Sequence, residues 1–331
     1  MGSEMCIRDR VKCFRDEDLR ADRQPEFTQI DIEMSFVDEN DVFFHMEGLT
    51  RHIFKSVQNI DLPDPFLRLT YTEAMETYGS DKPDLRYEMR LKDVKEFTDV
   101  SEFNAFKSAA VVKGLVVEGG AKYSRKIIDE LTNHVKKYKA KGLAWMKAED
   151  GVFIGGISKF FSDELQQSMF EKLRVNHGDI LFMIGDNSSI ALNALGQLRV
   201  DIARREKLFS NDQFIPVWIT EFPMFDYNEE TERFIAMHHP FTAPRDEDVE
   251  KLDSDPSSAL SRGYDLTING YEIAGGSIRI HEPELQRSVF EILGIDKKEA
   301  QERFGFFTDA LKLSLIHISE PTRPLYISYA V

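Results

Sequence analysis

The sequence changes its pattern twice, and this change is what most constrains the fold. Residues 11–85 and 211–312 carry strand patterns with a period of two residues and contain few helices. Between them, residues 86–210 alternate short apolar strands such as 178–186 with helices over 123–138 and 161–173, which Ser124 and Ser162 are predicted to cap. The simplest topology is an α+β fold in which an antiparallel-sheet domain is interrupted by an inserted α+β domain.

The first strand-type stretch predicts a long-looped antiparallel hairpin. Residues 11–18 and 27–36 have strand character, and residues 19–26 form the loop between them. An amphipathic helix is expected to follow over residues 41–57. The hairpin is unusual because charges of both signs crowd its first strand and its loop.

The second strand-type stretch predicts a hairpin that turns at the sequence NEET, residues 228–231. Further on, YDLTINGYEIAGGSIRIH predicts a strand, a break at Gly275 and Gly276, and a second strand. Glu272 and Arg279 would lie on opposite faces of an unbroken strand. We therefore expect a β-bulge at the two glycines, which would bring both side chains to one face.

Composition and charge exclude several classes of protein. The chain has 331 residues, of which 42% are hydrophobic, and a formal net charge of −16. This charge argues against binding nucleic acid through bulk electrostatics, although a local basic patch stays possible. No apolar run is long enough to span a membrane, so no membrane partner is expected. The two cysteines, Cys6 and Cys13, form neither a disulfide framework nor a zinc motif, which favours a cytoplasmic location.

The two ends differ from the rest of the chain. Residues 1–10 and 313–331 resemble the translation of sequencing-adapter read-through, and we interpret them as artefactual. The alternative is a natural tail of odd composition. Under the first interpretation, the natural protein runs from about residue 11 to residue 312 and is truncated at both ends.

The charged hairpin offers the first set of candidate site residues. Arg15, Glu17, Gln29 and Asp31 occupy strand positions, and the loop adds Arg20, Arg23 and Gln24. An arginine on a rigid strand can bind a phosphate or carboxylate with two hydrogen bonds, and acidic neighbours can bind an amine. A solvated face with weak surface ion pairs explains the same pattern, and spacing alone favours that alternative.

Two further sets lie near the end of the chain. His238 and His239 are adjacent on a predicted strand and point to opposite sides, so a shared metal is not expected. Asp265 and Glu272 could share a Mg²⁺ ion, and Arg279 could face an anionic group. The alternatives are a packed histidine, a glycine kink and an ordinary ion pair. Because the chain has no phosphate-binding glycine loop, a nucleotide would have to be held by arginines and a metal.

Taken together, these segments resemble the bacterial-type aspartyl-tRNA synthetases, which are class II aminoacyl-tRNA synthetases. FRDEDLRADRQPEFTQID resembles motif 2 of that family, and GSDKPDLR, TEFPMFD, HHPFTAP and GYEIAGGSIRIH match in order. Residues 86–210 are similar to the inserted domain of the bacterial branch. The resemblance implies the class II antiparallel-sheet core and an ATP-dependent aspartate–tRNA ligase.

The resemblance also implies a role for each matching residue on the ATP and tRNA side. Arg15 would hold the α-phosphate and the substrate carboxylate, and Glu17 and Gln24 would contact ATP. Arg20 and Arg23 would contact the tRNA acceptor end.

Other matching residues would bind aspartate and Mg²⁺. Asp31 and Gln29 would lie at the substrate amine, and His238 would lie against the aspartate. Asp265 and Glu272 would hold Mg²⁺ and phosphate. Arg279 would bind the aspartate side-chain carboxylate through a buried guanidinium, which asparagine's neutral amide would leave without a partner.

The match is incomplete, which affects the activity expected of this chain. The anticodon-binding barrel, motif 1, the segment before motif 2 with its lysine, and motif 3 have no counterpart in the sequence. We expect L-aspartate, ATP and tRNA(Asp) as partners and a homodimer for the full-length protein, whereas this chain would be a poor or inactive enzyme. The alternatives are a non-catalytic synthetase-like binding protein, or an asparagine or lysine ligase of the same class.

Overall fold

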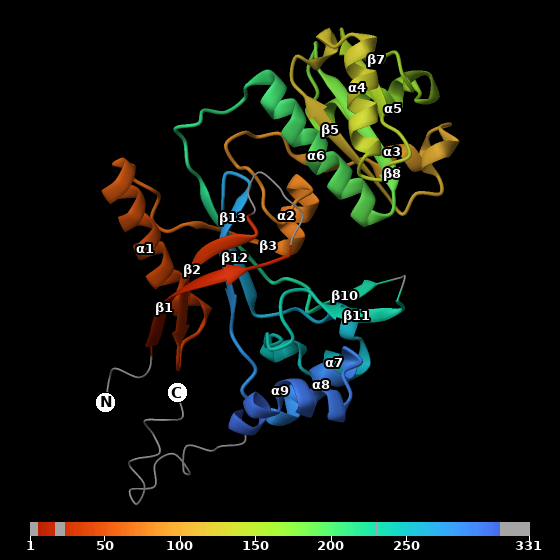
Figure 1. Cartoon of the computed structure of the whole chain (residues 1–331). Helices are drawn as coiled ribbons and strands as arrows, with labels where there is room; N and C mark the ends of the chain where they lie inside the picture. Colours follow the sequence, from red (N-terminus) through yellow and green to blue (C-terminus); the bar gives the residue numbers. More distant parts are fainter. Residues whose placement is uncertain (1–5, 17–23, 229–230, 312–331) are drawn as a thin grey trace, which may run out of the picture. The chain divides into compact units, whose positions relative to one another are not determined.

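A computed structural model describes residues 6–16, 24–228 and 231–311 (Figure 1). The chain divides into two compact units, which we describe separately. The first unit consists of Met1–Thr50, Thr220–Asp265 and Gly275–Val331, and the second consists of Arg51–Ile219 and Leu266–Ala274.

The second unit is built around a five-stranded antiparallel sheet with the order β4-β5-β8-β6-β7. Its strands are β4 (Leu91–Asp93), β5 (Val111–Val117), β6 (Ala144–Glu149), β7 (Val152–Ile154) and β8 (Ile180–Asp186). The central strands β5 and β8 are almost entirely buried, because helices cover both faces of the sheet.

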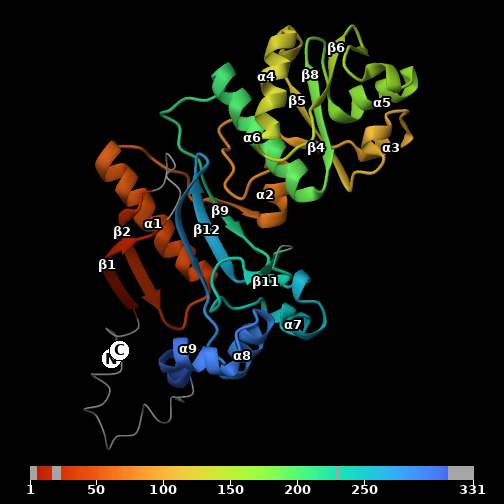
Figure 2. The same cartoon turned by 45° about the vertical axis from the view of Figure 1, so that its right-hand side comes forward.

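Two pairs of helices cover this sheet, as Figures 1 and 2 show. α4 (Arg125–Lys136) and α6 (Ser188–Glu206) pack on one face, and α3 (Lys95–Val100) and α5 (Asp163–Leu173) pack on the other. Ser124 and Ser162 accept hydrogen bonds at the helix N-termini, as the sequence predicted for both residues. The sheet and its helices confirm an α+β unit, whereas the exact bounds 86 and 210 stay a prediction.

Helix α2 (Tyr71–Tyr78) also packs on α6. Thr70 and Glu73 form a capping box at its N-terminus, and Gly79 ends it in the left-handed conformation with φ of 68°. A Cβ on Gly79 would lie 2.8 Å from the Cα of Gly196 on α6. Only two glycines allow the end of α2 to approach α6 this closely.

A four-stranded sheet has the order β13-β12-β9-β3. Its strands are β3 (Leu67–Thr70), β9 (Pro216–Thr220), β12 (Gly263–Ile268) and β13 (Tyr271–Ser277). The predicted break at Gly275 and Gly276 is wrong, because β13 runs through both glycines. The turn lies instead at Asn269 and Gly270, whose φ values of 54° and 88° suit a two-residue hairpin loop.

The register of this hairpin supports the predicted bulge. A two-residue loop places Ile268 opposite Tyr271, and regular pairing would then place Arg262 opposite Ser277. Instead, the amide of Ile278 donates to the carbonyl of Arg262 at 3.1 Å. The register has therefore shifted by one residue, which is the change that a β-bulge produces.

The first unit contains two small hairpins and a helical cluster. β1 (Cys6–Phe14) pairs with β2 (Glu26–Met34), and β10 (Phe225–Asn228) pairs with β11 (Arg233–Ala236). The turn predicted at NEET is confirmed, although Glu229 and Glu230 lie outside the described residues. Strand β1 starts and ends earlier than predicted, and it includes Cys6–Arg10, which the sequence interpretation had set aside.

Two helices of the first unit, α7 (Lys251–Ser254) and α8 (Pro283–Ile292), pack on a small apolar core that includes Met224, Phe225 and Val289. Helix α9 (Lys297–Leu311) packs against α8, where the Phe304 ring stacks on that of Phe290. Helix α1 (Glu39–Gln58), predicted over 41–57, crosses the division between the units. Short 3-10 helices occupy Asn104–Phe106, Gly120–Lys122, Ser158–Phe160, Asp246–Asp248 and Pro256–Ser258. Among the described residues, every helix is too short or too polar to traverse a lipid bilayer.

Candidate functional site

The β1–β2 hairpin places three of the predicted site residues on one face. The register pairs Val11 with Gln29 and continues to Arg15, whose amide donates to the carbonyl of Pro25 at 2.9 Å. Since directly opposed and alternate residues share a face, Arg15, Gln29 and Asp31 lie on the same side. Arg15 follows the end of β1 instead of lying within it, so its predicted strand position is wrong by one residue.

The environment of this face is open. The Arg15 guanidinium lies 5.2 Å from the centre of the Phe27 ring, and the Cys13 thiol donates to the Gln29 side chain at 3.6 Å. Gln24, predicted to contact ATP, is exposed just before β2. Glu17, Arg20 and Arg23 lie outside the described residues.

In the first unit, His238 and Asp265 meet beside the start of β12. His238 Nε2 lies 3.7 Å from Asp265 Oδ2, and its ring packs 4.3 Å from that of Phe222. A Cβ on Gly263 would overlap Nδ1 of the His238 ring and lie 3.0 Å from its Cε1, so a glycine is needed there. His238 therefore both contacts a carboxylate and packs on an aromatic ring. The histidines follow β11 in a turn and not in a strand, so the predicted strand placement is wrong.

The other face of β12 carries a part-buried ion pair. Arg262 donates to both carboxylate oxygens of Glu39 on α1, each at 2.7 Å, and the Phe43 ring meets the Tyr264 ring edge-on. Burial alone would raise the pKa of Glu39, but hydrogen bonds and charge from Arg262 lower it overall. Burial, reinforced by the charge of Glu39, raises the pKa of Tyr264 to about 12. This pair fixes the start of β12 relative to α1 within the first unit.

Arg279 lies at the edge of a small cavity in the first unit. The cavity has a volume of about 120 Å³, and Arg262, Asp246 and His281 also line it. Burial and the positive charge of Arg279 lower the pKa of His239. Arg279 itself is exposed, so the predicted buried guanidinium is wrong for this structure. His239 is the histidine that faces Arg279, a neighbour that the sequence did not indicate.

In the second unit, Glu272 has a neighbour that the sequence did not assign. Lys82 Nζ lies 3.6 Å from Glu272 Oε2, with the two side chains 28% and 44% exposed. Lys82 belongs to the GSDKPDLR segment, so its motif was recognised but its partner was not. Contacts between residues so distant in sequence carry no local signal.

A metal ion bound by the predicted ligands Asp265 and Glu272 would need further ligands from a substrate. Within residues 6–16, 24–228 and 231–311, no group of three or more acidic, histidine or cysteine side chains could hold a metal alone. Asp265 in the first unit and Glu272 in the second each provide oxygen atoms of the kind that Mg²⁺ prefers, and Mg²⁺ commonly takes one or two carboxylates together with phosphate oxygens. The chemistry of the residues therefore fits a metal–nucleotide complex better than a permanent metal site.

Comparisons with known proteins bear directly on these residues. Residues 9–318 match the family described as tRNA synthetases class II (D, K and N). A protein from Staphylococcus carnosus named aspartate–tRNA ligase is 49% identical over 307 residues, which cover 91% of this chain and 52% of the relative. Proteins from Desulfatibacillum aliphaticivorans and Persephonella marina, named aspartate–tRNA(Asp/Asn) ligases, are 49% and 51% identical and cover 91% of this chain.

These matches concern part of each relative, because the chain spans about half the length of the curated relatives it matches. Among solved structures, an aspartyl tRNA synthetase from Entamoeba histolytica covers 94% of this chain and 41% of its own, at 17% identity. Its TM-score of 0.41 is too low to support a statement about the fold. The family match covers nearly the whole chain, so the expected fold class is confirmed and the chain belongs to the class II tRNA synthetases of the D, K and N group.

Proposed function

We propose that this chain carries the catalytic residues of an aspartate–tRNA ligase. The observation that carries the proposal is the identity of 49–51% to aspartate–tRNA ligases over 91% of the chain. The shared face of Arg15, Gln29 and Asp31, and the cluster of His238 and Asp265, support it. The free thiol of Cys13 is compatible with the proposed cytoplasmic location.

The proposed reaction has two steps. In the first, a carboxylate oxygen of L-aspartate attacks the α-phosphorus of ATP, the bond to the β-phosphate oxygen breaks, and aspartyl-adenylate and pyrophosphate form. In the second, the 3′-terminal hydroxyl of tRNA(Asp) attacks the aspartyl carbonyl and AMP leaves. Charge develops on the α-phosphate in the first step, so a preorganised cation lowers the barrier.

Arg15 is the proposed cation, because it can hold the α-phosphate and the aspartate carboxylate in one fork of hydrogen bonds. Glu17 and Gln24 would contact ATP, and Arg20 and Arg23 would contact the tRNA acceptor end. A bound Mg²⁺ ion would neutralise phosphate charge, with Asp265 and Glu272 as the residues that hold it.

On the proposed amino-acid side, Asp31 and Gln29 would bind the ammonium and His238 would lie against the substrate. Arg279 would bind the side-chain carboxylate. Its present exposure is compatible with this role, since a bound aspartate would itself cover the guanidinium. A neutral asparagine side chain would leave that charge without a partner, which gives the site its selectivity.

The proposal is tested by ATP–pyrophosphate exchange with aspartate, asparagine and lysine supplied separately. Because the relatives are about twice as long, the chain is assayed alone and also in place of the matching half of the Staphylococcus carnosus relative. We expect exchange with aspartate only. Exchange with asparagine or lysine would assign a sister ligase, and exchange with none in either form would favour a binding protein.

Arg279→Leu provides a sharper test of the selectivity argument. We expect it to reduce aspartate-dependent exchange by about 100-fold or more, because the substrate carboxylate loses its charged partner. Arg287→Leu, which removes an exposed guanidinium on α8 paired with Glu284, is the matched control and should leave exchange unchanged. Equal exchange in the wild type and Arg279→Leu would refute the assigned role.

We further propose a homodimer for the full-length protein. The names of two relatives include tRNA(Asp/Asn), so aminoacylation of both tRNAs is the alternative specificity to test. Charging assays with each purified tRNA distinguish the two possibilities.

A further inference from the structure

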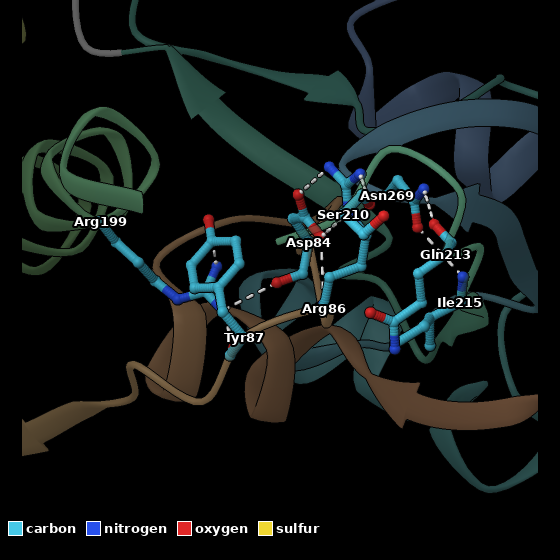
Figure 3. Close-up of polar contacts among 8 residues, drawn as sticks. All are labelled: Asp84, Arg86, Tyr87, Arg199, Ser210, Gln213, Ile215 and Asn269. Carbon is cyan, nitrogen blue, oxygen red and sulfur yellow. Dashed lines mark hydrogen bonds and ion pairs between the residues drawn. The ribbon is translucent and has the colours of Figure 1, made fainter. Parts of the chain in front are cut away.

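Arg199 is a deeply buried cation whose guanidinium hydrogen-bonds to one segment, residues 84–89. It also lies 4.9 Å from the centre of the Tyr78 ring on α2. It lies on α6 and is 1% exposed. Its guanidinium donates to the carbonyls of Asp84 at 2.8 Å and Tyr87 at 3.0 Å, and to the Tyr87 hydroxyl at 3.2 Å (Figure 3). It also donates to the carbonyl of Met89 at 2.6 Å. The Tyr87 ring also lies 4.1 Å from the guanidinium carbon. One side chain therefore holds a whole turn of the segment 84–89.

Burial of the Arg199 guanidinium carries a desolvation cost, which its hydrogen bonds must offset. A buried guanidinium is tolerated only where its donors are satisfied, and here the acceptors are carbonyl dipoles and a hydroxyl. If the donors are removed, the buried carbonyls of Asp84 and Tyr87 and the part-buried carbonyl of Met89 lose these partners. Lysine keeps the charge but offers a single donor centre, which cannot reproduce the planar fork of arginine.

A second set of contacts fixes the same segment. Arg86 donates to both carboxylate oxygens of Asp84, at 2.9 and 2.6 Å, and to the carbonyl of Ser210 at 3.1 Å. Its guanidinium also lies 3.9 Å from the centre of the Phe209 ring. Figure 3 shows that Arg199 and Arg86 bind neighbouring parts of the segment from different sides.

Lys82 lies between two fixed points of this segment. On one side, Gly79 contacts α6 at Gly196, and on the other, Asp84 is held by Arg199 and Arg86. The β12–β13 turn also packs against this segment, since a Cβ on Gly270 would lie 3.5 Å from the Cβ of Asp84. Asn269 in the same turn binds the carbonyl of Gln213 at 2.7 Å. These contacts leave Lys82 facing Glu272.

We propose that Arg199 is a positioning residue that holds the segment 79–89 so that Lys82 faces Glu272 and the pair meets the phosphates of a Mg²⁺-bound nucleotide. The nucleotide part of this inference rests on the proposed function. The placement of Lys82 by Arg199 does not, because it depends only on contacts within the second unit.

The placement is tested by the rate at which an activated ester acylates Lys82, followed by mass spectrometry of the whole chain. In Glu272→Gln the lysine loses its charged partner, and this variant defines labelling without the pair. We expect Arg199→Met to raise Lys82 labelling roughly fivefold, the factor expected when a partly exposed ion pair is lost. Labelling of the exposed Lys126 serves as the internal reference and should not change.

Gln166→Met is the matched structural control. Gln166 on α5 is also buried and also binds backbone, at Phe153 in β7 and at Phe161, but it contacts the opposite face of the sheet. We expect this variant to leave Lys82 labelling unchanged. If Arg199→Met does not fold, Arg199→Lys is used instead, and it should give labelling between those of the wild type and Glu272→Gln. Wild-type labelling of Lys82 in either folded Arg199 variant would overturn the proposal.

A second arm separates this inference from the proposed function. Labelling is repeated with Mg²⁺ and a non-hydrolysable ATP analogue. We expect protection of Lys82 in the wild type, and weaker protection in Arg199→Met. If the analogue protects neither protein, the nucleotide role fails, while the labelling without nucleotide still establishes or refutes the placement of Lys82.

Discussion

Replacement of Gly196 by alanine should destabilise the protein, although helix propensity predicts the reverse. Gly196 lies inside α6, where alanine is favoured over glycine by about 1 kcal/mol. A Cβ at this position, however, would overlap the carbonyl oxygen of Gly79 and lie 2.7 Å from its carbonyl carbon and 3.0 Å from its Cα. Carbon atoms in contact normally lie about 3.5–4.0 Å apart, so the end of α2 would have to move by about 1 Å.

The two effects can be compared. Overpacking costs about 1–3 kcal/mol, and the upper part of that range applies because both partners are backbone atoms that cannot change rotamer. Subtraction of the propensity gain leaves a net loss of about 2 kcal/mol in the free energy of unfolding. With a urea dependence of about 2 kcal/mol per molar, the unfolding midpoint should fall by about 1 M.

Gly48 provides the matched control, because it also lies inside a helix, α1, but has no atom within 4 Å of its missing Cβ. Gly48→Ala should stabilise the protein by about 0.5–1 kcal/mol. Unfolding is followed by circular dichroism and by the fluorescence of Trp145 and Trp218, which both lie in the second unit with Gly196. A midpoint for Gly196→Ala at or above that of the wild type would show that the α2–α6 contact is looser than described.

Three further predictions concern charged and titrating groups. Arg262→Met should lower the free energy of unfolding by about 1–2 kcal/mol at pH 7. Because the folded pKa of Glu39 is lowered, this contribution to stability exists above the unfolded pKa of about 4.5 and is lost as the pH falls through the folded pKa. Urea titrations of the wild type and the variant at several pH values should therefore converge in acid, and a constant difference would contradict the assignment. Burial raises the pKa of Tyr264 to about 12, so the stability that its neutral hydroxyl contributes is fully present below pH 10 and falls as the pH rises toward 12. Tyr264→Phe should remove this alkaline loss of stability. An unchanged stability profile at alkaline pH would disprove the role of Tyr264. Glu272→Gln should raise the Mg²⁺ concentration needed for half-maximal ATP–pyrophosphate exchange several-fold, whereas an identical Mg²⁺ titration would exclude Glu272 as a ligand.

Features that depend on neighbouring residues were predictable from the sequence. Ser124 and Ser162 were recognised as helix caps because a cap hydrogen bond joins residues three apart. The hairpin at NEET was recognised because strand periodicity stops and resumes around it. Such signals need no knowledge of the distant chain.

The β12–β13 hairpin shows how a local signal can be misread. Asn-Gly is the strongest short signal for a two-residue turn, yet the break was assigned to Gly275 and Gly276. In the structure, Gly276 instead leaves room for a neighbouring side chain, since a Cβ there would lie 2.8 Å from the Tyr264 ring. A glycine that makes room for a distant aromatic ring has the same local appearance as one that breaks a strand.

The candidate site residues also divide into those with a local sequence signal and those without one. Alternation along the second strand was enough to place Gln29 and Asp31 on one face. That Arg15 shares this face follows from the register of the two strands, which the structure supplies. Neither Lys82 nor Arg199 could be assigned a partner, because those partners come from distant parts of the chain and only the folded second unit brings them together. By our proposal α6 therefore holds Lys82, and the five strands β4–β8 lie between the two in the sequence. If the labelling experiment confirms this placement and the ATP analogue also protects Lys82, the α+β segment that the sequence predicted as an insertion contributes to nucleotide binding.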